Sequence, residues 1–556
     1  MDLRKNSKLN TVDSKFLDDN MDSLIKSYNE FIGKFIEINN LKHLSLLITS
    51  TCRNPFDSYL FDYFSKLFLL ENVIKFQEMP DFLIIDDIQF EAINFILIKY
   101  SLQNKINVQI KKTDFLVKRI FLNILKSFYY MLSDWFWTRV INTKNIPKDD
   151  IIYLDSFLQL NTIDSEGIVT DRHYPDYQNF LPSELINKVW VAPTLISIKS
   201  QSDYVKILTR INKSNTKFLI QESWLTTSDY FYSFIMAILI PLKKLEFTSI
   251  NKIPSKSLMS SLFYRDIGSP VLMKAIYRYR FIKRLASKNI KIRTAINWHE
   301  NQIIDRALNL SFRKFYPKVI VKGYQGFPSM KSYLSIQPTC YENELETLPH
   351  QICVISDIYK QTKLDVCNSL DVIISPAFRY SYLFKFERKK ISKNEHFILI
   401  LLPGIISEIN ETLKVANYLR SVLPDKVKVV IKLHPRYSVR DIEKFIPRFA
   451  NNQLPVTGEI LENLLPYTDI LVTSGSSSAV EAVAVGIPTV ICANNYGLTN
   501  NFIPESVSED LSAVCYDHNQ IKNFVDLSLA RGVYNNSVDE FFCKPNEKLT
   551  YKLFSS

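Results

Sequence analysis

Short runs of β-branched and apolar residues recur along this chain, and longer segments with the apolar periodicity of helices separate them. Strands that alternate with helices form βαβ units, in which neighbouring strands pair in parallel. The runs are apolar almost throughout, as in strands that helices cover on both faces. The pattern therefore predicts an α/β fold with parallel sheets.

The expected strands extend over most of the chain, whose 556 residues are enough for more than one packed core. In the first half they are Leu44–Thr49, Phe82–Asp86, Ile106–Ile110, Ile151–Asp155, Val189–Ala192 and Phe218–Gln221. In the second half they are Ile292–Asn297, Val319–Lys322, Ile352–Ser356, Val372–Ser375, Phe397–Leu402, Val427–Leu433, Ile470–Thr473, Thr489–Cys492 and Ala513–Tyr516.

A domain boundary is expected near residues 380–395, where the sequence FERKKISKNEH is polar, charged and without strand or helix signal. Residues 1–40 are expected to be a flexible or helical lead-in. Residues 41–385 would then form a first Rossmann-like domain with helical insertions, and residues 386–540 a second, compact one. Residues 541–556 remain as a C-terminal tail.

The formal net charge of +11 favours phosphate-bearing ligands, anionic membrane surfaces or nucleic acid. The sequence contains no zinc-ligand spacing, RNA-binding signature or long basic block, so we expect no nucleic-acid partner. The seven cysteines are scattered without a CxxC pair. We therefore expect reduced thiols, and neither a disulfide framework nor a metal site.

No apolar signal-peptide core is seen near the N-terminus, and the longest apolar run, Tyr230–Leu242, is too short to span a bilayer. We therefore expect a cytoplasmic protein. The aromatic segment Lys118–Ile141 leaves two interpretations open. It is either a buried helix of a large domain, or a helix on the inner face of the membrane with Trp135 and Trp137 at headgroup level.

The most informative motif is DILVTSGSSSAVEAVAVGIPTVI, at residues 469–491. A strand runs into Ser474-Gly475-Ser476-Ser477-Ser478, and a helix that carries Glu481 follows. Free N–H groups at a helix start, together with serine hydroxyls, favour a phosphate or diphosphate. Glu481 is placed to accept hydrogen bonds from ribose hydroxyls. The alternative is an ordinary turn with serine caps, but one of only 11 glycines beside a serine triplet favours the phosphate site.

Two further motifs follow predicted strands. In VKVVIKLHPRY, Pro435 ends the strand and leaves His434 at the edge of the sheet, between Lys432 and Arg436. An imidazole there can donate to a phosphate oxygen. In FILILLPGIISEINETL, Gly404 lets the backbone approach a ligand, and Glu408 follows. Glu408 is a candidate base or nucleophile, or else a carboxylate favoured by the helix dipole.

The order PG-x3-E, KLHP and TSGSSSAVEA is similar to the C-terminal half of GT-B bacterial surface-carbohydrate glycosyltransferases. It resembles most the CMP-donor group, the capsule and lipopolysaccharide Kdo transferases, and bacterial sialyltransferases more distantly. The resemblance implies two Rossmann-like domains with parallel sheets facing a cleft. It also implies that His434 and Pro435 contact the nucleotide phosphate, and that Ser474, Gly475, Ser476 and Ser477 cradle it.

The segments NWHENQIIDRAL, KGYQGF and ISPAFRY resemble uncharacterised surface carbohydrate biosynthesis proteins of the same type, so that the likeness covers about residues 290–520. The related pattern GYQH ends in a His where this chain has Gly326. Glu300 follows a predicted strand and is a candidate general acid/base. We expect Tyr324 and Gln325 to line the cleft, Arg379 to meet an anionic sugar carboxylate, and Asp305 and Arg306 to form a helix salt bridge. Glu222, at another strand end, is a weaker carboxylate candidate.

No Asp-x-Asp triplet occurs in the sequence, which fits a GT-B enzyme that needs no metal or other cofactor. The predicted reaction moves a sugar, preferably Kdo or a related 3-deoxy-ulosonate from a CMP donor, onto a surface glycan or lipid-linked glycan. Retention of configuration would make Glu408 the nucleophile and Glu300 its acid/base partner, while inversion needs one base. A CDP-polyol phosphotransferase, a UDP-sugar-dependent GT-B enzyme or epimerase, and a non-catalytic scaffold remain alternatives.

Overall fold

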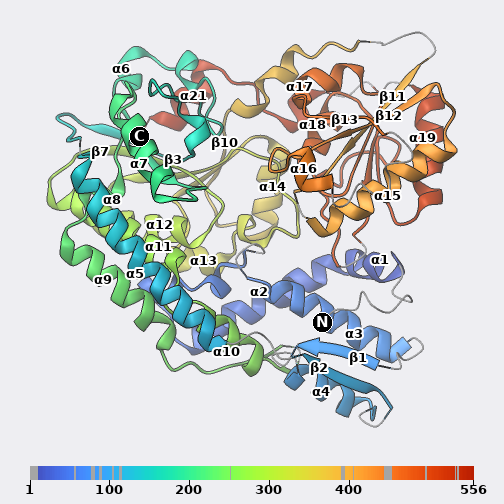
Figure 1. Cartoon of the computed structure of the whole chain (residues 1–556), viewed down its shortest axis with the longest axis horizontal. Helices are drawn as coiled ribbons and strands as arrows, with labels where there is room; N and C mark the ends of the chain where they lie inside the picture. The colour runs from blue at the N-terminus through green and yellow to red at the C-terminus, as the bar shows by residue number, and fades with distance from the viewer. Residues whose placement is uncertain are drawn as a thin grey trace.

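The computed structural model describes residues 11–54, 58–76, 82–86, 90–102, 105–111, 116–143, 145–250, 252–389, 395–404, 406–443, 454–494, 497–532, 534 and 537–555. Within these residues the chain forms two domains, each built around a six-stranded sheet (Figure 1). All neighbouring strands in both sheets pair in parallel. The α/β class with two Rossmann-like domains is therefore confirmed.

The second domain's sheet has the order β13-β12-β11-β14-β15-β16. Its strands are β11 His396–Leu401, β12 Val427–Lys432, β13 Val456–Thr457, β14 Ile470–Thr473, β15 Thr489–Cys492 and β16 Ser512–Cys515. The connecting helices are α15 Ile406–Val422, α16 Val439–Glu443, α17 Leu461–Leu464, α18 Ser478–Ala484 and α19 His518–Arg531. The strand order reverses at β11, and open α/β sheets bind ligands beyond the carboxyl ends of the strands at such a point.

The first domain's sheet has the order β10-β9-β8-β7-β3-β4, with the same reversal at its first strand, β3. Its strands are β3 Ile151–Leu158, β4 Val189–Leu195, β7 Ile292–Trp298, β8 Ile320–Gln325, β9 Gln351–Val354 and β10 Val372–Ile374. Its helices are α6 Ser183–Ile186, α7 Gln201–Lys213, α8 Gln221–Trp224, α9 Thr227–Leu239, α10 Lys256–Arg265, α11 Pro270–Ser287, α12 Ile303–Phe315, α13 Cys340–Glu344 and α14 Asp357–Val366.

The region before β3 is mainly helical, with α1 Thr11–Asp19, α2 Met21–Ile38, α3 Leu60–Phe76, α4 Phe90–Lys99 and α5 Leu116–Val140. The predicted strands at residues 82–86 and 106–110 form a separate parallel pair, β1 Phe82–Asp86 and β2 Asn107–Lys111. A short antiparallel pair, β5 Ser249–Ile250 and β6 Ile253–Pro254, follows α9. None of the helices in the described ranges is long and apolar enough to cross a membrane.

Two predicted strands of the first half are wrong. Residues 44–49 lie in the 3₁₀ turns His43–Leu46 and Thr49–Cys52, whose apolar side chains fill the core without joining a sheet. Phe218 makes only an isolated bridge to Val191, and α8 begins at Gln221. Short apolar runs were misleading here because a buried turn and a buried strand have the same pattern.

Residues 11–38 of the expected flexible or helical lead-in form the helices α1 and α2, and residues 1–10 lie outside the described ranges. One face of α2 is fully buried, including Tyr28, Ile32 and Phe35, and it belongs to the largest core cluster of the first domain. The apolar residues of α2 recur at helical spacing, so this face could form only by packing against another element.

The C-terminal segment also belongs to the first domain, although it follows the second along the chain. It forms α20 Val538–Phe541 and α21 Glu547–Phe554. The ring of Phe554 stacks on Tyr177 at 5.0 Å, and Lys322 Nζ donates to the carbonyl of Ser555 at 2.6 Å. The chain therefore crosses between the domains twice.

The expectation of reduced thiols without a disulfide is corrected at one pair. Cys340 at the start of α13 and Cys367 after α14 are joined by a disulfide across a Cα–Cα distance of 5.2 Å. Spacing along the sequence could not reveal this pair, because the fold alone brings α13 and α14 together. Cys52, Cys353, Cys492, Cys515 and Cys543 are not disulfide-bonded.

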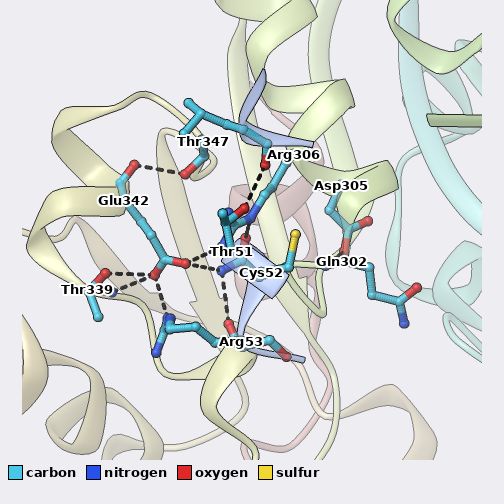
Figure 2. Close-up of polar contacts among 12 residues, drawn as sticks. Thr51, Cys52, Arg53, Gln302, Asp305, Arg306, Thr339, Glu342 and Thr347 are labelled. Atoms are coloured by element: carbon cyan, nitrogen blue, oxygen red, sulfur yellow. Dashed lines mark hydrogen bonds and ion pairs between the residues drawn. The ribbon is translucent and has the colours of Figure 1, made fainter. Parts of the chain in front are cut away.

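A buried ion network ties the N-terminal region to the first sheet (Figure 2). The carboxylate of Glu342 accepts from Arg53 Nη2 at 2.5 Å and from Arg306, and all three side chains are at most 1% exposed. Burial opposes ionisation of Glu342, but the charges of Arg53 and Arg306 outweigh it and lower its pKa. Arg306 therefore pairs with Glu342. The helix salt bridge predicted for Asp305 and Arg306 is not formed.

We expect Glu342→Gln to lower the free energy of unfolding by about 3–5 kcal/mol, because it leaves two guanidinium groups buried without a counter-charge. The matched control is Asp526→Asn, which breaks the exposed pair with Lys522 and should leave the free energy of unfolding almost unchanged. Urea denaturation measures both. Equal losses in the two variants would contradict the role given to the network.

Candidate functional site

Three loops leave the second sheet side by side, after β12, β11 and β14. Leu401 of β11 lies in register with Lys432 on one side and Thr473 on the other. The loop after β11 therefore lies between the loop that holds His434 and the loop that holds Ser474. Two strand spacings separate the outer loops, about 10 Å, which is within the reach of one nucleotide diphosphate.

His434 lies directly against the β11 loop. A Cβ atom on Gly404 would be 3.2 Å from His434 Nε2, so a larger residue there would require the imidazole to move by a few tenths of an ångström. Tyr437 Oη donates to the Gly404 carbonyl at 2.8 Å, and the Arg436 N–H donates to His434 Nδ1 at 3.2 Å. Since Nδ1 accepts, the proton of the neutral ring is on Nε2. Burial lowers the pKa of His434, and the charges of Arg436 and Lys432 lower it further.

Glu408, in the first turn of α15, is the most perturbed group at this edge. Its Oε1 accepts from Asn500 Nδ2 at 2.9 Å, while Oε2 is buried and accepts no hydrogen bond within the described part of the chain. A Cβ atom on Gly475 would be 3.5 Å from Oε2, which places the carboxylate beside the serine loop. Burial raises the pKa of Glu408 to about 7, and the Asn500 hydrogen bond offsets only part of the shift.

The serine loop depends on Gly475. Its φ is +122°, and a Cβ atom there would be 2.8 Å from Cβ of Asn500, so no other residue fits without a shift of the backbone. The Ser474 and Thr412 hydroxyls are 2.6 Å apart, and Ser476 Oγ accepts from the Ser478 N–H at 3.3 Å. The side chain of Ser477 caps nothing in α18. The hydroxyls of Ser474 and Ser476, which were predicted to hold a phosphate, therefore make hydrogen bonds within the protein.

Glu481 joins the two domains. Its Oε2 accepts a hydrogen bond from Tyr382 in the 3₁₀ segment Phe378–Lys385 of the first domain. Burial raises the pKa of Glu481, while the hydrogen bonds from Tyr382 and Ser478 and the nearby charge of Arg379 lower it. Arg379 is exposed, and its guanidinium carbon is 5.7 Å from the ring centre of Trp298 at the end of β7. Arg379 thus lies between the first sheet and α18.

Glu300 is held on the first domain. Its carboxylate accepts from Trp298 Nε1 at 2.8 Å, Gln302 Nε2 at 2.8 Å and Tyr333 Oη at 3.1 Å. These donors all belong to the first domain, so Glu300 is near the first sheet's switch point but is not joined to Glu408. Asp305 accepts from the Glu300 and Gln302 N–H groups and thereby caps α12.

Several other sequence-based predictions for the first domain are corrected. Tyr324 and Gln325 do not line a cleft: both are buried, and their side chains donate to the carbonyls of Pro376 and Ile336. Glu222 is buried in an ion pair with Lys274, at the start of α8 and not at the end of a strand. A Cβ atom at Gly326 would lie 2.3 Å from the Tyr324 ring, so the His of the related pattern has no room here.

Sequence reasoning missed residues that complete the site from outside the motifs. Asn500 contacts Glu408, and Thr412 contacts Ser474. Tyr382 contacts Glu481. The ring centre of His173 is 4.5 Å from that of Trp298. Asn500 stands in a polar TNN segment after β15, which was the only available signal.

Glu408 and Ser474 line a cavity of about 340 Å³ together with Asn494, Tyr516 and His518, among others, and His434 is not part of its lining. A second cavity of about 480 Å³ lies between the domains, with α1, α14 and the loop at residues 329–337 facing residues 499–506. In the described ranges no cluster of three or more His, Cys, Asp or Glu could hold a metal ion.

Burial of Glu408 predicts a pH-dependent stability. Its pKa is higher in the folded state than in the unfolded chain, so the folded state binds the extra proton and unfolding becomes easier as pH rises from 4.5 through about 7. Relative to Glu408→Gln, which cannot titrate, the wild type should lose about 3 kcal/mol between pH 4 and pH 8. Urea denaturation across this range measures the difference. Parallel pH profiles of the two proteins would contradict the burial.

No protein-family model matches the chain, and no curated protein matches it either. Among solved structures, a putative UDP-N-acetylglucosamine 2-epimerase from Listeria monocytogenes is similar at 12% identity and a TM-score of 0.40, over 71% of this chain and 94% of that one.

Two further solved structures are similar over a comparable share of the chain. The lipopolysaccharide outer core galactosyltransferase WaaB matches at 11% identity and a TM-score of 0.41, over 73% of this chain and 98% of that one. Acinetobacter baumannii MurG matches at 9% identity and a TM-score of 0.34, over 73% and 98%. At these low scores the likenesses do not assign an activity, and the fold class follows from the two parallel sheets.

Proposed function

We propose that this chain is a glycosyltransferase that takes a sugar from a nucleotide donor bound at the carboxyl ends of β11, β12 and β14. The observation that supports this most is Glu408: a buried carboxyl with one unpaired oxygen, a pKa near 7, and a position beside the glycine-serine loop at the switch point of a Rossmann-ordered sheet. Perturbed carboxyls in such positions are typical of catalytic sites.

The donor's phosphate would lie between the loops after β12 and β14. His434 would donate from Nε2 to a phosphate oxygen, and Lys432 and Arg436 would add positive charge, with Pro435 fixing the loop. Gly404 and Gly475 would let the backbone approach the ligand, and the N–H groups of residues 474–477 would complete the cradle. In this proposal no metal is needed, because protein groups offset the charge of the leaving nucleotide.

Glu408 would act at the reacting sugar carbon. In a retaining reaction it would attack as the nucleophile, with Glu300 as acid/base partner after the domains close, and in an inverting reaction it would take the proton of the acceptor hydroxyl. A 3-deoxy-ulosonate carried by CMP is the preferred donor, because Arg379 could pair with its carboxylate. A UDP-linked sugar fits the same loops, and the acceptor would be a surface glycan or its lipid-linked precursor.

A nucleotide screen tests the donor class. The cognate nucleotide should raise the melting temperature, since a ligand at 100 times its Kd stabilises the folded state by about 3 kcal/mol. CMP, CDP, UMP, UDP and GDP are compared, and ³¹P NMR then follows turnover of the matching sugar donors with and without EDTA. Release of CMP supports the preferred donor, and release of UDP the alternative. Consumption of CDP-glycerol with release of CMP but no sugar transfer would favour a phosphotransferase, and C2 inversion of UDP-GlcNAc an epimerase.

The rate should depend on Glu408 and His434. The kcat/KM of the wild type should fall about tenfold for each pH unit below 7, because the protonated carboxyl of Glu408 is inactive as base or nucleophile. Glu408→Gln should abolish turnover, and His434→Ala should lower kcat/KM about 100-fold at an unchanged melting temperature. The matched control is His396→Ala, at the opposite end of β11. Full activity of both site variants would contradict the roles given to Glu408 and His434, and absence of turnover by the wild type with every donor would favour a non-catalytic scaffold.

A further inference from the structure

Helix α5 (Leu116–Val140) packs on the protein mainly through polar side chains and leaves an apolar face exposed. The side chains that it buries are Ser127, Met131, Asp134 and Thr138, three of them polar. Ser127 Oγ donates to the Gly268 carbonyl at 2.7 Å, and Asp134 accepts from Lys274 Nζ at 2.6 Å. Hydrogen bonds and an ion pair therefore hold this helix to α11 and its neighbours, in place of the apolar stripe that a helix of a water-exposed domain normally buries.

The opposite face of α5 is apolar over its whole length. A stripe at helical spacing is 43–76% exposed and consists of Val117, Phe121, Leu125, Phe128, Leu132, Phe136 and Val140. Leu122, Tyr129 and Tyr130 widen it. The two tryptophans that the sequence had suggested for this role are not part of the stripe: Trp135 Nε1 donates to Thr227, and Trp137 packs on the core beneath α7.

A second stripe continues the first on the neighbouring helix. Helix α9 (Thr227–Leu239) runs beside α5 along one edge of the molecule (Figure 1), and the rings of Phe128 and Phe234 are 5.8 Å apart. On α9 and the turn after it the exposed apolar residues are Phe231, Tyr232, Ile235, Leu239 and Leu242. We call the two stripes together the α5–α9 face. Exposed apolar surfaces of this extent mark interaction sites.

The charges of the α5–α9 face have one sign. The basic residues of α5 include Lys118, Arg119, Lys126 and Arg139, all exposed. Each helix carries a single carboxylate, and neither reaches the solvent face: Asp134 pairs with Lys274, and Asp229 with Arg280 and Arg284. The face therefore combines aromatic and aliphatic side chains with positive charge alone.

We propose that the α5–α9 face docks on an anionic lipid bilayer. Helices that lie in the plane of a membrane insert an apolar face rich in aromatic residues to the depth of the acyl boundary, and their lysines and arginines contact lipid phosphates. Phe121, Phe128 and Phe136 would enter the apolar layer, Tyr129 and Tyr130 would lie at the headgroups, and Lys118, Arg119 and Lys126 would supply the electrostatic part. The polar anchors on the buried side hold α5 in this orientation before it meets the membrane.

Co-sedimentation of the full chain with phosphatidylglycerol vesicles tests the proposal, with phosphatidylcholine vesicles as the neutral surface. The wild type should bind the anionic vesicles more tightly, and salt should weaken the binding. The triple variant Phe121→Glu, Leu125→Glu, Leu132→Glu should lose at least about tenfold in partition coefficient. Replacing Lys118, Arg119 and Lys126 by Gln should cost about fivefold for each charge on the anionic vesicles and almost nothing on the neutral ones.

Matched controls separate the face from general surface effects. Ile460→Glu, Leu527→Glu, Tyr551→Glu adds the same charge at residues of similar exposure on other elements and should bind like the wild type. Melting temperatures show that all variants fold. Equal loss in both triple variants, or absence of binding by the wild type, overturns the proposal. A concentration-dependent dimer that the α5 variant alone abolishes, without vesicle binding by the wild type, would assign the face to a second copy of the chain.

Discussion

The parallel pairing of β12 and β14 on either side of β11 is the constraint on which the candidate site depends. Because the three strands are in register at Lys432, Leu401 and Thr473, their loops leave the sheet at one level. The motifs in these loops are separated by dozens of residues, and no contact between them could form without this sheet. Glu408, His434 and Gly475 then acquire their properties from one another: Gly404 admits His434, and Gly475 closes over Glu408.

The sequence was informative where a feature depends on local pattern. Buried parallel strands such as Ile470–Thr473 and Thr489–Cys492 were predicted at their observed bounds, because a strand covered on both faces is apolar at every position. The positions of Glu408, His434 and Ser474 at strand ends followed from the same pattern. The roles of these residues remain predictions, since the structure places them without testing what they do.

Features that depend on tertiary contacts could not be predicted from the sequence. The pKa of Glu408 reflects its burial and the amide of Asn500, which comes from a loop after another strand. The Cys340–Cys367 pair and the return of α21 to the first domain have no periodic signal at all. The helix α5 was recognised by its period, but its orientation was not, because the polar residues that it buries find partners on α9, on α11 and at Gly268 that only the fold supplies.

The return of the C-terminal segment restricts how the two domains can move. The connection after the Phe378–Lys385 segment leads into the second domain, and the one after α19 leads back to the first. A body tethered to another at two separate points can rotate about the line that joins them, whereas twisting across that line would stretch one tether. Any rotation of the second domain relative to the first would therefore be limited to a swing about a single axis.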